Sequence, residues 1–281
     1  MLFHAHITSL ISHPWLMKPK FAVLMTDFGL QDPFVGVMRG VILSRAPNAK
    51  IMNLTHQIPP QDIYTAAFYL MVSVSYFPRG SLFMVVVDPG VGSERDILWA
   101  RSKWYQFLAP DNGVLSWVEE GSPKERFEEV RVVRNDKLFL HPVSSTFHGR
   151  DIFSPAAGAL LKGMSPKTLG PVRTDYKKVP FPKPKKVLNR VSGSVIGVDR
   201  FGNVITNLMD KDVTPTTVFY LKGKVVAGLK PAYAFVKKGE ALAFVGSFRF
   251  VELSVRNGSF AEMFGVKTGD PIEATLSLDA S

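Results

Sequence analysis

A carboxylate, two glycines and a cation follow one another closely after a strongly apolar stretch of this 281-residue chain. The apolar residues Leu82 to Val87 predict a buried strand, which delivers Asp88 onto a Gly-rich turn ending at Arg95. Glycine lets the backbone approach a ligand closely, and a neighbouring guanidinium stabilises an ionised carboxylate. The segment therefore suits either the lip of an active site or an ordinary surface salt bridge.

A second carboxylate, Asp27, follows the apolar run Phe21 to Met25 in the turn Thr26-Asp27-Phe28-Gly29. Acidic residues at strand ends accept hydrogen bonds from the two ribose hydroxyls in nucleotide-binding folds. The alternative is an Asp that caps a helix or shapes a turn. The residue is a candidate for ribose binding.

His148 is the candidate histidine of a functional site, because it directly precedes a predicted Ala-rich helix. The free N–H groups at a helix start favour an anion or another polar ligand, although a lone histidine is more often structural. Of its neighbours, Asp151 is a candidate cap for that helix. Arg150 is a candidate bidentate partner for Asp88 or Asp27.

In the last third of the chain, one tight turn carries a carboxylate, an aromatic ring and an amide: Asp199, Phe201 and Asn203. This trio suits an amino-acid ammonium and carboxylate together with a stacked base. The competing interpretation is an ordinary hairpin turn built around Gly202.

Two common kinds of catalytic site are not expected. The chain has no cysteine, so it has no thiol catalysis, thiolate metal site or disulfide. It also lacks the Gly-x-Ser-x-Gly elbow of serine hydrolases. A metal site would have to draw on a set of donors without the spacing of a known ligand motif, and we therefore expect no metal. These donors are Asp27, His56, Asp88, His148 and Asp151.

The first part of the chain alternates short apolar runs with helical spacing, and Asp62 is a candidate helix cap. This alternation predicts an α/β domain with a mainly parallel, Rossmann-like sheet, in which ligands lie at the carboxyl ends of the strands. The predicted strands are 21–25, 51–54, 82–87 and the run before residue 110, and the predicted helices are 35–44, 63–76 and 152–161.

The pattern changes after a segment rich in Pro and Lys, residues 174–186, which predicts an extended linker. Beyond it, alternating strands broken by glycine turns predict a smaller all-β, barrel-like domain. We therefore expect an N-terminal arm without ordered structure at 1–20, an α/β domain at 21–173 and a β domain at 187–281. The predicted strands of the last domain are 191–198, 218–221, 241–245 and 250–255.

Composition and charge also limit which class of protein this chain belongs to. Hydrophobic residues make up 46% of the chain, but the longest apolar runs are far shorter than the roughly 20 residues of a membrane-spanning helix. The first residues make a poor signal peptide, so we expect a cytoplasmic protein with no membrane contact. The net charge of +10 is scattered, and the densest Lys cluster is interleaved with Pro. We therefore do not expect nucleic acid as a partner.

Taken together and in order, five motifs resemble the S-adenosyl-L-methionine hydroxide adenosyltransferase family, the water-using relatives of fluorinases and chlorinases. The resemblance runs from about residue 21 to residue 272. The motifs are Thr26-Asp27-Phe28-Gly29, Asp88-Pro89-Gly90-Val91-Gly92-Ser93 with Arg95, Ala109-Pro110-Asp111-Asn112-Gly113, Phe147-His148-Gly149-Arg150-Asp151 and Asp199-Arg200-Phe201-Gly202-Asn203.

The resemblance implies a role for each matched position. The family's water-activating triad falls on Asp88, Arg95 and His148, and its ribose-binding acid falls on Asp27, with Phe28 beside it in the binding site. The methionine-binding acid and amide fall on Asp199 and Asn203, with Phe201 near the adenine or the methionine. The adenine-contacting strand and turn, which act mostly through the backbone, fall near the C-terminus, at Ser254, Arg256 and Gly258.

The resemblance also implies a reaction and an assembly. Members of the family use water to split S-adenosyl-L-methionine into adenosine and L-methionine by direct (SN2) attack on the ribose C5′, with no metal or other cofactor. They form homotrimers that bind the substrate between one subunit's first domain and its neighbour's second. In halogenating relatives the position of Asp88 is uncharged, so a carboxylate here favours water over halide.

Two other functions stay open at this point. The chain could bind S-adenosyl-L-methionine or adenosine as a sensor without significant turnover, or it could use a halide as the nucleophile. Physical chemistry favours hydrolysis, because a sulfonium makes methionine a good leaving group and the enzyme has chiefly to position and partly deprotonate a water.

Overall fold

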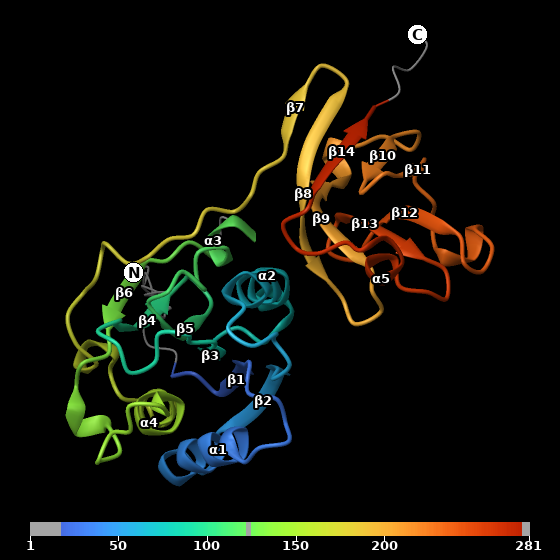
Figure 1. Ribbon diagram of the computed structural model, residues 1–281. Helices are drawn as coiled ribbons and strands as arrows, with labels where there is room; N and C mark the ends of the chain where they lie inside the picture. Colours follow the sequence, from blue (N-terminus) through green and yellow to red (C-terminus); the bar gives the residue numbers. More distant parts are fainter. Residues whose placement is uncertain (1–17, 122–124, 277–281) are drawn as a thin grey trace, which may run out of the picture. The chain divides into compact units, whose positions relative to one another are not determined.

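A computed structural model describes residues 18–121 and 125–276 of the chain (Figure 1). The chain divides into two compact units. The first contains the described residues up to 66 and from 73 to 178, and the second contains residues 67–72 and the described residues from 179 onwards. The two units match the predicted pair of an α/β domain and a β domain.

The first unit is built on a six-stranded, mainly parallel sheet, as the alternation of strands and helices predicts. Four neighbouring strands run parallel, and the last two are antiparallel additions at one edge. In spatial order the strands are β2 (Lys50–Thr55), β1 (Phe21–Thr26), β3 (Leu82–Val86), β5 (Gln106–Pro110), β4 (Ile97–Arg101) and β6 (Glu129–Val132).

Two helices, α1 (Phe34–Arg45) and α4 (Ser154–Lys162), lie side by side and cover one face of this sheet (Figure 1). Alternate strand residues point into this core, as the two-residue period of a strand requires. Ala22 and Leu24 of β1 meet Met38 and Ile42 of α1 there. This packing fixes the ends of the strands, where the candidate residues begin.

Asp27 directly follows β1 and Asp88 lies two residues after the end of β3, so both carboxylates lie at the carboxyl end of the parallel sheet, as predicted. The predicted cap is also confirmed: Asp62 Oδ1 accepts a hydrogen bond from the Thr65 backbone N–H at 2.9 Å, at the start of α2 (Ile63–Ser73). The helix predicted over 63–76 ends earlier, because its last turn tightens into a 3₁₀ turn at Val74–Tyr76. Another short helix, α3 (Val118–Gly121), follows β5.

The second unit is an eight-stranded, antiparallel sheet with a short helix, α5 (Phe260–Phe264). A parallel bridge from Leu229 to Ala243 joins the two ends of the strand order, so the sheet is nearly closed and barrel-like, as predicted. The strands are, in spatial order, β11 (Lys224–Ala227), β10 (Val218–Leu221), β14 (Pro271–Thr275), β8 (Arg190–Val198), β9 (Val204–Met209), β13 (Phe250–Val255) and β12 (Ala241–Val245), with β7 (Lys185–Val187) paired to β8.

Several strands have no counterpart in the sequence prediction. Burial explains β9, in which five of six residues are buried, so that the polar and apolar alternation of a half-exposed strand is absent. The short β11 and β14 carry too few residues for a clear pattern. In the segment predicted as a linker, the last two residues already belong to β7.

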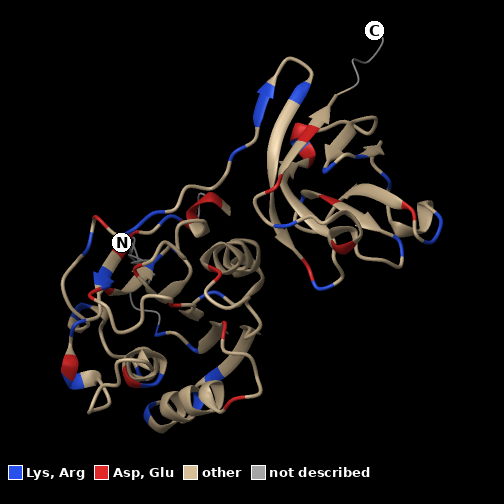
Figure 2. Cartoon of the chain, in the orientation of Figure 1, with Lys and Arg blue, Asp and Glu red and all other residues tan. Residues whose placement is uncertain are grey.

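Figure 2 shows Lys and Arg on many elements of both units, in keeping with the scattered charge of the sequence. Over the described part of the chain, no helix is both long and apolar enough to cross a membrane.

Candidate active site

Asp88, Arg95 and His148, which are up to 60 residues apart in sequence, form one connected group. Arg95 Nε lies 3.0 Å from Oδ1 and 2.9 Å from Oδ2 of Asp88, and Arg95 Nη2 also contacts Oδ2. The same Nη2 lies 2.9 Å from His148 Nδ1. The side chains of Asp88 and Arg95 are only 4% and 10% exposed, so the guanidinium joins a largely buried carboxylate to the imidazole.

The contact with Arg95 determines the form of His148. A guanidinium can only donate hydrogen bonds, so Nδ1 must be the acceptor and the proton of the neutral ring lies on Nε2. Burial, and next the charge of Arg95, lower the pKa of His148, while Asp88 and Asp151 oppose this shift. The ring is therefore neutral at physiological pH, with a defined tautomer.

Close backbone approach holds the loop after β3 in place. Gly92 has φ +79°, and a Cβ at this residue would lie 2.3 Å from the carbonyl oxygen of Ser145. Only glycine allows the loop that carries Arg95 to touch the loop that carries His148. On the other side, Asn112 Nδ2 donates to the carbonyl oxygen of Val87 at 2.9 Å and so anchors the residue before Asp88.

The loop before His148 is held by a second ion pair, which corrects two predictions. Arg150 binds neither Asp88 nor Asp27. Its Nε and Nη2 donate to the two carboxylate oxygens of Asp151 at 2.6 and 3.0 Å. Asp151 is not a helix cap either, because it lies inside a π-helical turn, Gly149–Phe153, that precedes α4.

In that position Asp151 acts as a clamp. It is 1% exposed, and its Oδ2 accepts the backbone N–H of Ser144 at 2.8 Å. Burial alone would raise the pKa of Asp151, but the hydrogen bonds from Arg150 and the Ser144 backbone hold it below its usual value. The clamp thus ties together the two ends of the segment 144–151, which contains His148. The sequence motif contains both residues, but their pairing with each other is not what a helix predicts, because adjacent residues on a helix do not normally face each other.

Asp27 and Phe28 lie in the turn after β1. Asp27 Oδ2 accepts the backbone N–H of Gln61 at 2.8 Å, and the carboxylate keeps further acceptor capacity. Phe28 packs edge-on against Phe34 and Phe147, with ring centroids 5.8 and 6.2 Å apart. Because Phe147 precedes His148, this aromatic cluster brings the first turn of the unit to the loop that carries the imidazole.

The candidate residues of the second unit include the turn between β8 and β9. Asp199 Oδ1 accepts the backbone N–H groups of Phe201 and Asn203 at 2.8 and 2.9 Å, and Oδ2 accepts Asn203 Nδ2 at 2.8 Å. Phe201 is 76% exposed. The hairpin interpretation is therefore correct for the backbone. The turn exposes the ring of Phe201, whereas Asn203 is only 4% exposed and its amide binds Asp199.

The other candidates of this unit lie on and after β13. Ser254 is fully buried, and its side chain interacts with the side chain of Tyr233. Arg256 Nη1 donates to the carbonyl oxygen of Val236 at 2.7 Å. Gly258 closes a tight turn, in which its N–H donates to the carbonyl oxygen of Val255. β13 and the turn that follows it thus carry a cluster of polar groups, which we call the polar surface of the second unit.

The sequence did not single out two further residues of this surface, Glu252 and Tyr233. Burial, together with the charge of Asp199, raises the pKa of Glu252 to about 7. Burial raises the pKa of Tyr233, hydrogen bonding with Ser254 and Asn203 opposes this shift, and the charges of Glu252 and Asp199 add to it. The available signal was a lone Glu inside the apolar strand run Phe250 to Val255, two residues before Ser254 and hence on the same face.

The structure thus brings the candidate residues together in two groups, one in each unit. The first unit holds Asp88, Arg95 and His148 in direct contact, with Asp27 and Phe28 at the same end of the sheet. The second unit holds the Asp199 turn and β13. Across the described ranges, no three His, Asp or Glu side chains are grouped as metal ligands would be.

Two family models cover most of the chain. The model of the S-adenosyl-L-methionine hydroxide adenosyltransferase N-terminal domain matches residues 22–170, and that of the C-terminal domain matches residues 193–273. The chain belongs to the S-adenosyl-L-methionine hydroxide adenosyltransferase family. The resemblance found from the five motifs is confirmed.

Individual relatives agree with the family. The chain is 35% identical over 265 residues to an (R)-S-adenosyl-L-methionine hydrolase of Thermus thermophilus, with 91% of this chain and 99% of the relative covered. A fluorinase of Actinoplanes sp. is 25% identical, with 89% and 96% covered. The fold is also similar to the crystal structure of an uncharacterized conserved protein from Thermotoga maritima, at a TM-score of 0.83 and 34% identity over 90% of this chain and 99% of that one.

The approach of Gly92 to Ser145 leads to a first prediction. Gly92→Ala should lower the free energy of unfolding by about 1 kcal/mol or more beyond Gly223→Ala, measured in urea. Gly223 has a similar φ of +75° but open space around its Cβ, so it isolates the backbone penalty from the clash. By NMR titration, the pKa of His148 should move toward its usual value in Gly92→Ala, because the loop moves Arg95 away. Equal destabilisation of the two variants would contradict this account.

The raised pKa of Glu252 leads to a second prediction. The folded chain binds this proton more tightly than the unfolded chain, so stability should fall as pH rises from about 4.5 to about 7. Glu252→Gln should remove this slope, which we expect to be on the order of 1 kcal/mol once solvent screening of a partly exposed group is allowed for. Urea unfolding across this pH range measures it. Glu262→Gln, at an exposed residue, is the control, and an unchanged slope in Glu252→Gln would refute the assignment.

Proposed function

We propose that this chain hydrolyses S-adenosyl-L-methionine to adenosine and L-methionine. The observation that carries the proposal is the contact of Asp88, Arg95 and His148, in a chain that belongs to the hydroxide adenosyltransferase family and is similar to a named hydrolase. The substrate class follows from the family, and the chemistry follows from this group.

In the proposed reaction, a water oxygen attacks C5′ of the ribose in line with the sulfonium. The C5′–S bond breaks, its electron pair stays on sulfur to give the neutral thioether of methionine, and one water proton is released. Arg95 stabilises the developing hydroxide by its charge, and the group formed with Asp88 and His148 takes up and passes on the proton. The leaving group is already activated by its positive charge, so we propose that no metal or other cofactor takes part.

The remaining candidate residues are proposed to bind the substrate. Asp27 would accept the ribose hydroxyls, beside the ring of Phe28. In the second unit, Asp199 and Asn203 would bind the amino-acid end, with Phe201 against the adenine or the methionine. Ser254, Arg256 and Gly258 would form the adenine-contacting turn, mostly through their backbone. The Asp199 carboxylate, and Glu252 in its ionised form, suit a substrate that carries a sulfonium and an ammonium.

Water is favoured over halide as the nucleophile. The Asp88 carboxylate lies next to Arg95 and neutralises it, so a halide ion would meet a negative charge where the cation could otherwise hold it. A neutral water has no such penalty and gains a proton acceptor. The greater identity to the Thermus hydrolase than to the Actinoplanes fluorinase supports the same choice.

The test is to incubate the protein with S-adenosyl-L-methionine and follow adenosine and methionine by chromatography. We expect Asp88→Asn and His148→Ala each to lower kcat by roughly 100-fold or more, because both act on the proton of the reacting water. Asp27→Asn should chiefly raise KM, and Asp175→Asn, at a residue 81% exposed, should behave like the unchanged protein.

Other outcomes of this experiment would contradict the proposal. Tight substrate binding without adenosine above the buffer blank would identify a sensor. A 5′-halogenated nucleoside formed in the presence of fluoride or chloride would identify a halide-using enzyme. Equal loss of affinity in all three site variants would separate the Asp88 group from the chemical step.

We also propose a cytoplasmic homotrimer, in which the first unit of one chain and the second unit of its neighbour complete a shared site. The division of the binding residues between two units supports an arrangement of this kind. Light scattering should give three times the chain mass of 31.1 kDa at the concentrations where the protein is active. A fully active monomer would refute the shared site.

A further inference from the structure

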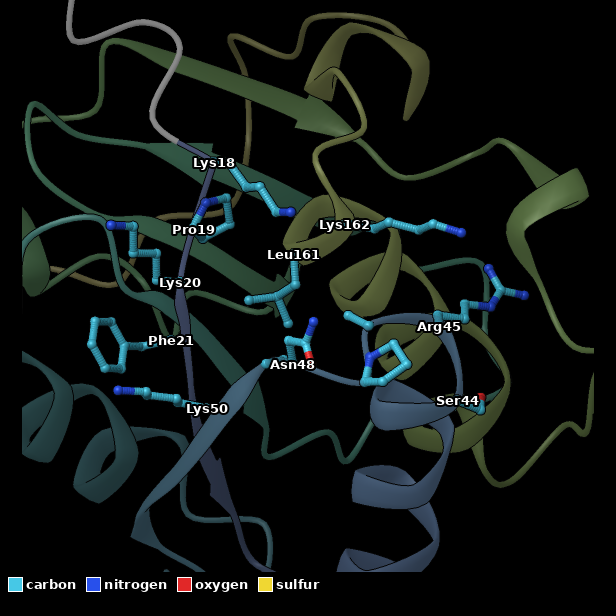
Figure 3. A pocket seen from close by; sticks show the side chains of 13 residues that line it. Lys18, Pro19, Lys20, Phe21, Ser44, Arg45, Asn48, Lys50, Leu161 and Lys162 are labelled. Atoms are coloured by element: carbon cyan, nitrogen blue, oxygen red, sulfur yellow. The ribbon is translucent and has the colours of Figure 1, made fainter.

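A pocket of about 610 Å³ opens at the amino end of the first unit's sheet, where β1 and β2 begin and α1 and α4 end (Figure 3). We call it the basal pocket. Its volume lies in the range of small-molecule sites, roughly 300–1,000 Å³. Five of the residues that line it are cationic, and none is Asp or Glu. These five are Lys18, Lys20, Arg45, Lys50 and Lys162.

The cations of the basal pocket lack counter-charges. No salt bridge joins any of the five to an acidic residue of the described ranges. Their contacts are of other kinds: Arg45 Nη1 lies 3.4 Å from the Pro155 carbonyl oxygen, and Lys50 Nζ lies 5.7 Å from the centre of the Phe21 ring. Like charges gathered around one hollow raise its potential and attract an anion.

Part of this charge has a simpler explanation. Arg45 and Lys162 lie in the last turns of α1 and α4, where a cation compensates the helix dipole. Lys18, Lys20 and Lys50 have no such role, because Lys18 and Lys20 precede β1 and Lys50 begins β2. These three lysines carry the inference.

The shape of the basal pocket indicates the kind of anion. Figure 3 shows Lys18 and the Asn48 amide around Leu161, Lys20 and Lys50 on the side of Phe21, and Arg45 and Lys162 on the side of the helices. The charges are thus spread along the hollow rather than collected at one point. Between them, Phe21 and Leu161 provide an apolar surface. A linear chain of phosphates attached to an organic group matches both features, whereas one phosphate would meet only one end.

The basal pocket is distinct from the candidate active site. β1 runs from Phe21, at the pocket, to Thr26, directly before Asp27. A six-residue strand spans about 20 Å. A ligand in the basal pocket therefore lies at the opposite end of the sheet from the Asp88 group.

We propose that the basal pocket binds a small organic polyphosphate of the nucleoside triphosphate class. Calorimetry on the full chain, with ATP, inorganic tripolyphosphate and inorganic phosphate as probes, tests this. Saturating adenosine is added so that any nucleoside site is already filled. We expect ATP to bind more tightly than tripolyphosphate, and tripolyphosphate more tightly than phosphate, with affinities that fall as salt is raised.

The matched variants are Lys18→Gln/Lys50→Gln, in the basal pocket, and Lys167→Gln/Lys238→Gln, at exposed lysines elsewhere. Both remove two positive charges. The pocket variant should weaken ATP binding at least about tenfold, and the control should stay within about twofold of the unchanged protein. Neither should change the hydrolysis of S-adenosyl-L-methionine measured without ATP.

The proposal is overturned if ATP and tripolyphosphate fail to bind, if the pocket and control variants lose affinity equally, or if adenosine abolishes ATP binding. Binding of duplex DNA or RNA that is tighter than that of ATP and depends on the same two lysines would also overturn it, in favour of a nucleic-acid surface. Because tripolyphosphate contains no nucleoside, its result is independent of the proposed hydrolase activity.

Discussion

The guanidinium of Arg95 is the group on which the arrangement of the candidate active site depends. It binds Asp88 through two nitrogens and uses one of them to reach His148. Each of the three side chains would be unfavourable alone: a largely buried carboxylate without a cation, a buried cation without an anion, or an imidazole without a fixed tautomer. Together they form a nearly neutral unit, and in the proposed reaction this unit orients the water molecule.

The three side chains meet only if two loops that are distant in sequence are held in fixed positions. Hydrogen bonds and one close backbone contact hold these loops. Gly92 allows the loops to touch at Ser145, Asn112 anchors the chain at Val87, and Asp151 clamps the segment before His148. A π-helical turn at Gly149–Phe153 directly follows the imidazole, a feature often found at functional sites. The hydrophobic core between the sheet and helices α1 and α4 supplies the stability that offsets this local irregularity.

Charge is distributed unevenly among the functional surfaces. The polar surface of the second unit gathers Asp199 and Glu252, and burial together with the charge of Asp199 raises the pKa of Glu252. Such a pair of acidic side chains suits a cationic ligand. The basal pocket gathers lysines without acids and suits an anion. The net charge of +10 shows neither the acidic surface nor the basic pocket, because it is a sum over the whole chain. An acidic and a basic surface thus occur in a chain that is basic overall.

The sequence by itself determined the class of the fold and the types of the site residues. Strand and helix periodicity separated the α/β domain from the β domain, and the glycine turns after apolar runs placed Asp27 and Asp88 at strand ends, because these signals are local. The sequence also predicts the pair of Asp88 and Arg95, which are seven residues apart. Only the tertiary structure decided the partners that lie further away or in a helical turn: Arg95 also contacts His148, and Arg150, a candidate partner of Asp88 or Asp27, binds Asp151 instead. For Glu252 the neighbouring residues show only that an acid lies inside an apolar strand, whereas its burial and the charge of Asp199, which raise its pKa, come from the fold. The buried strand β9 was overlooked because burial on both faces removes the alternation that marks a half-exposed strand.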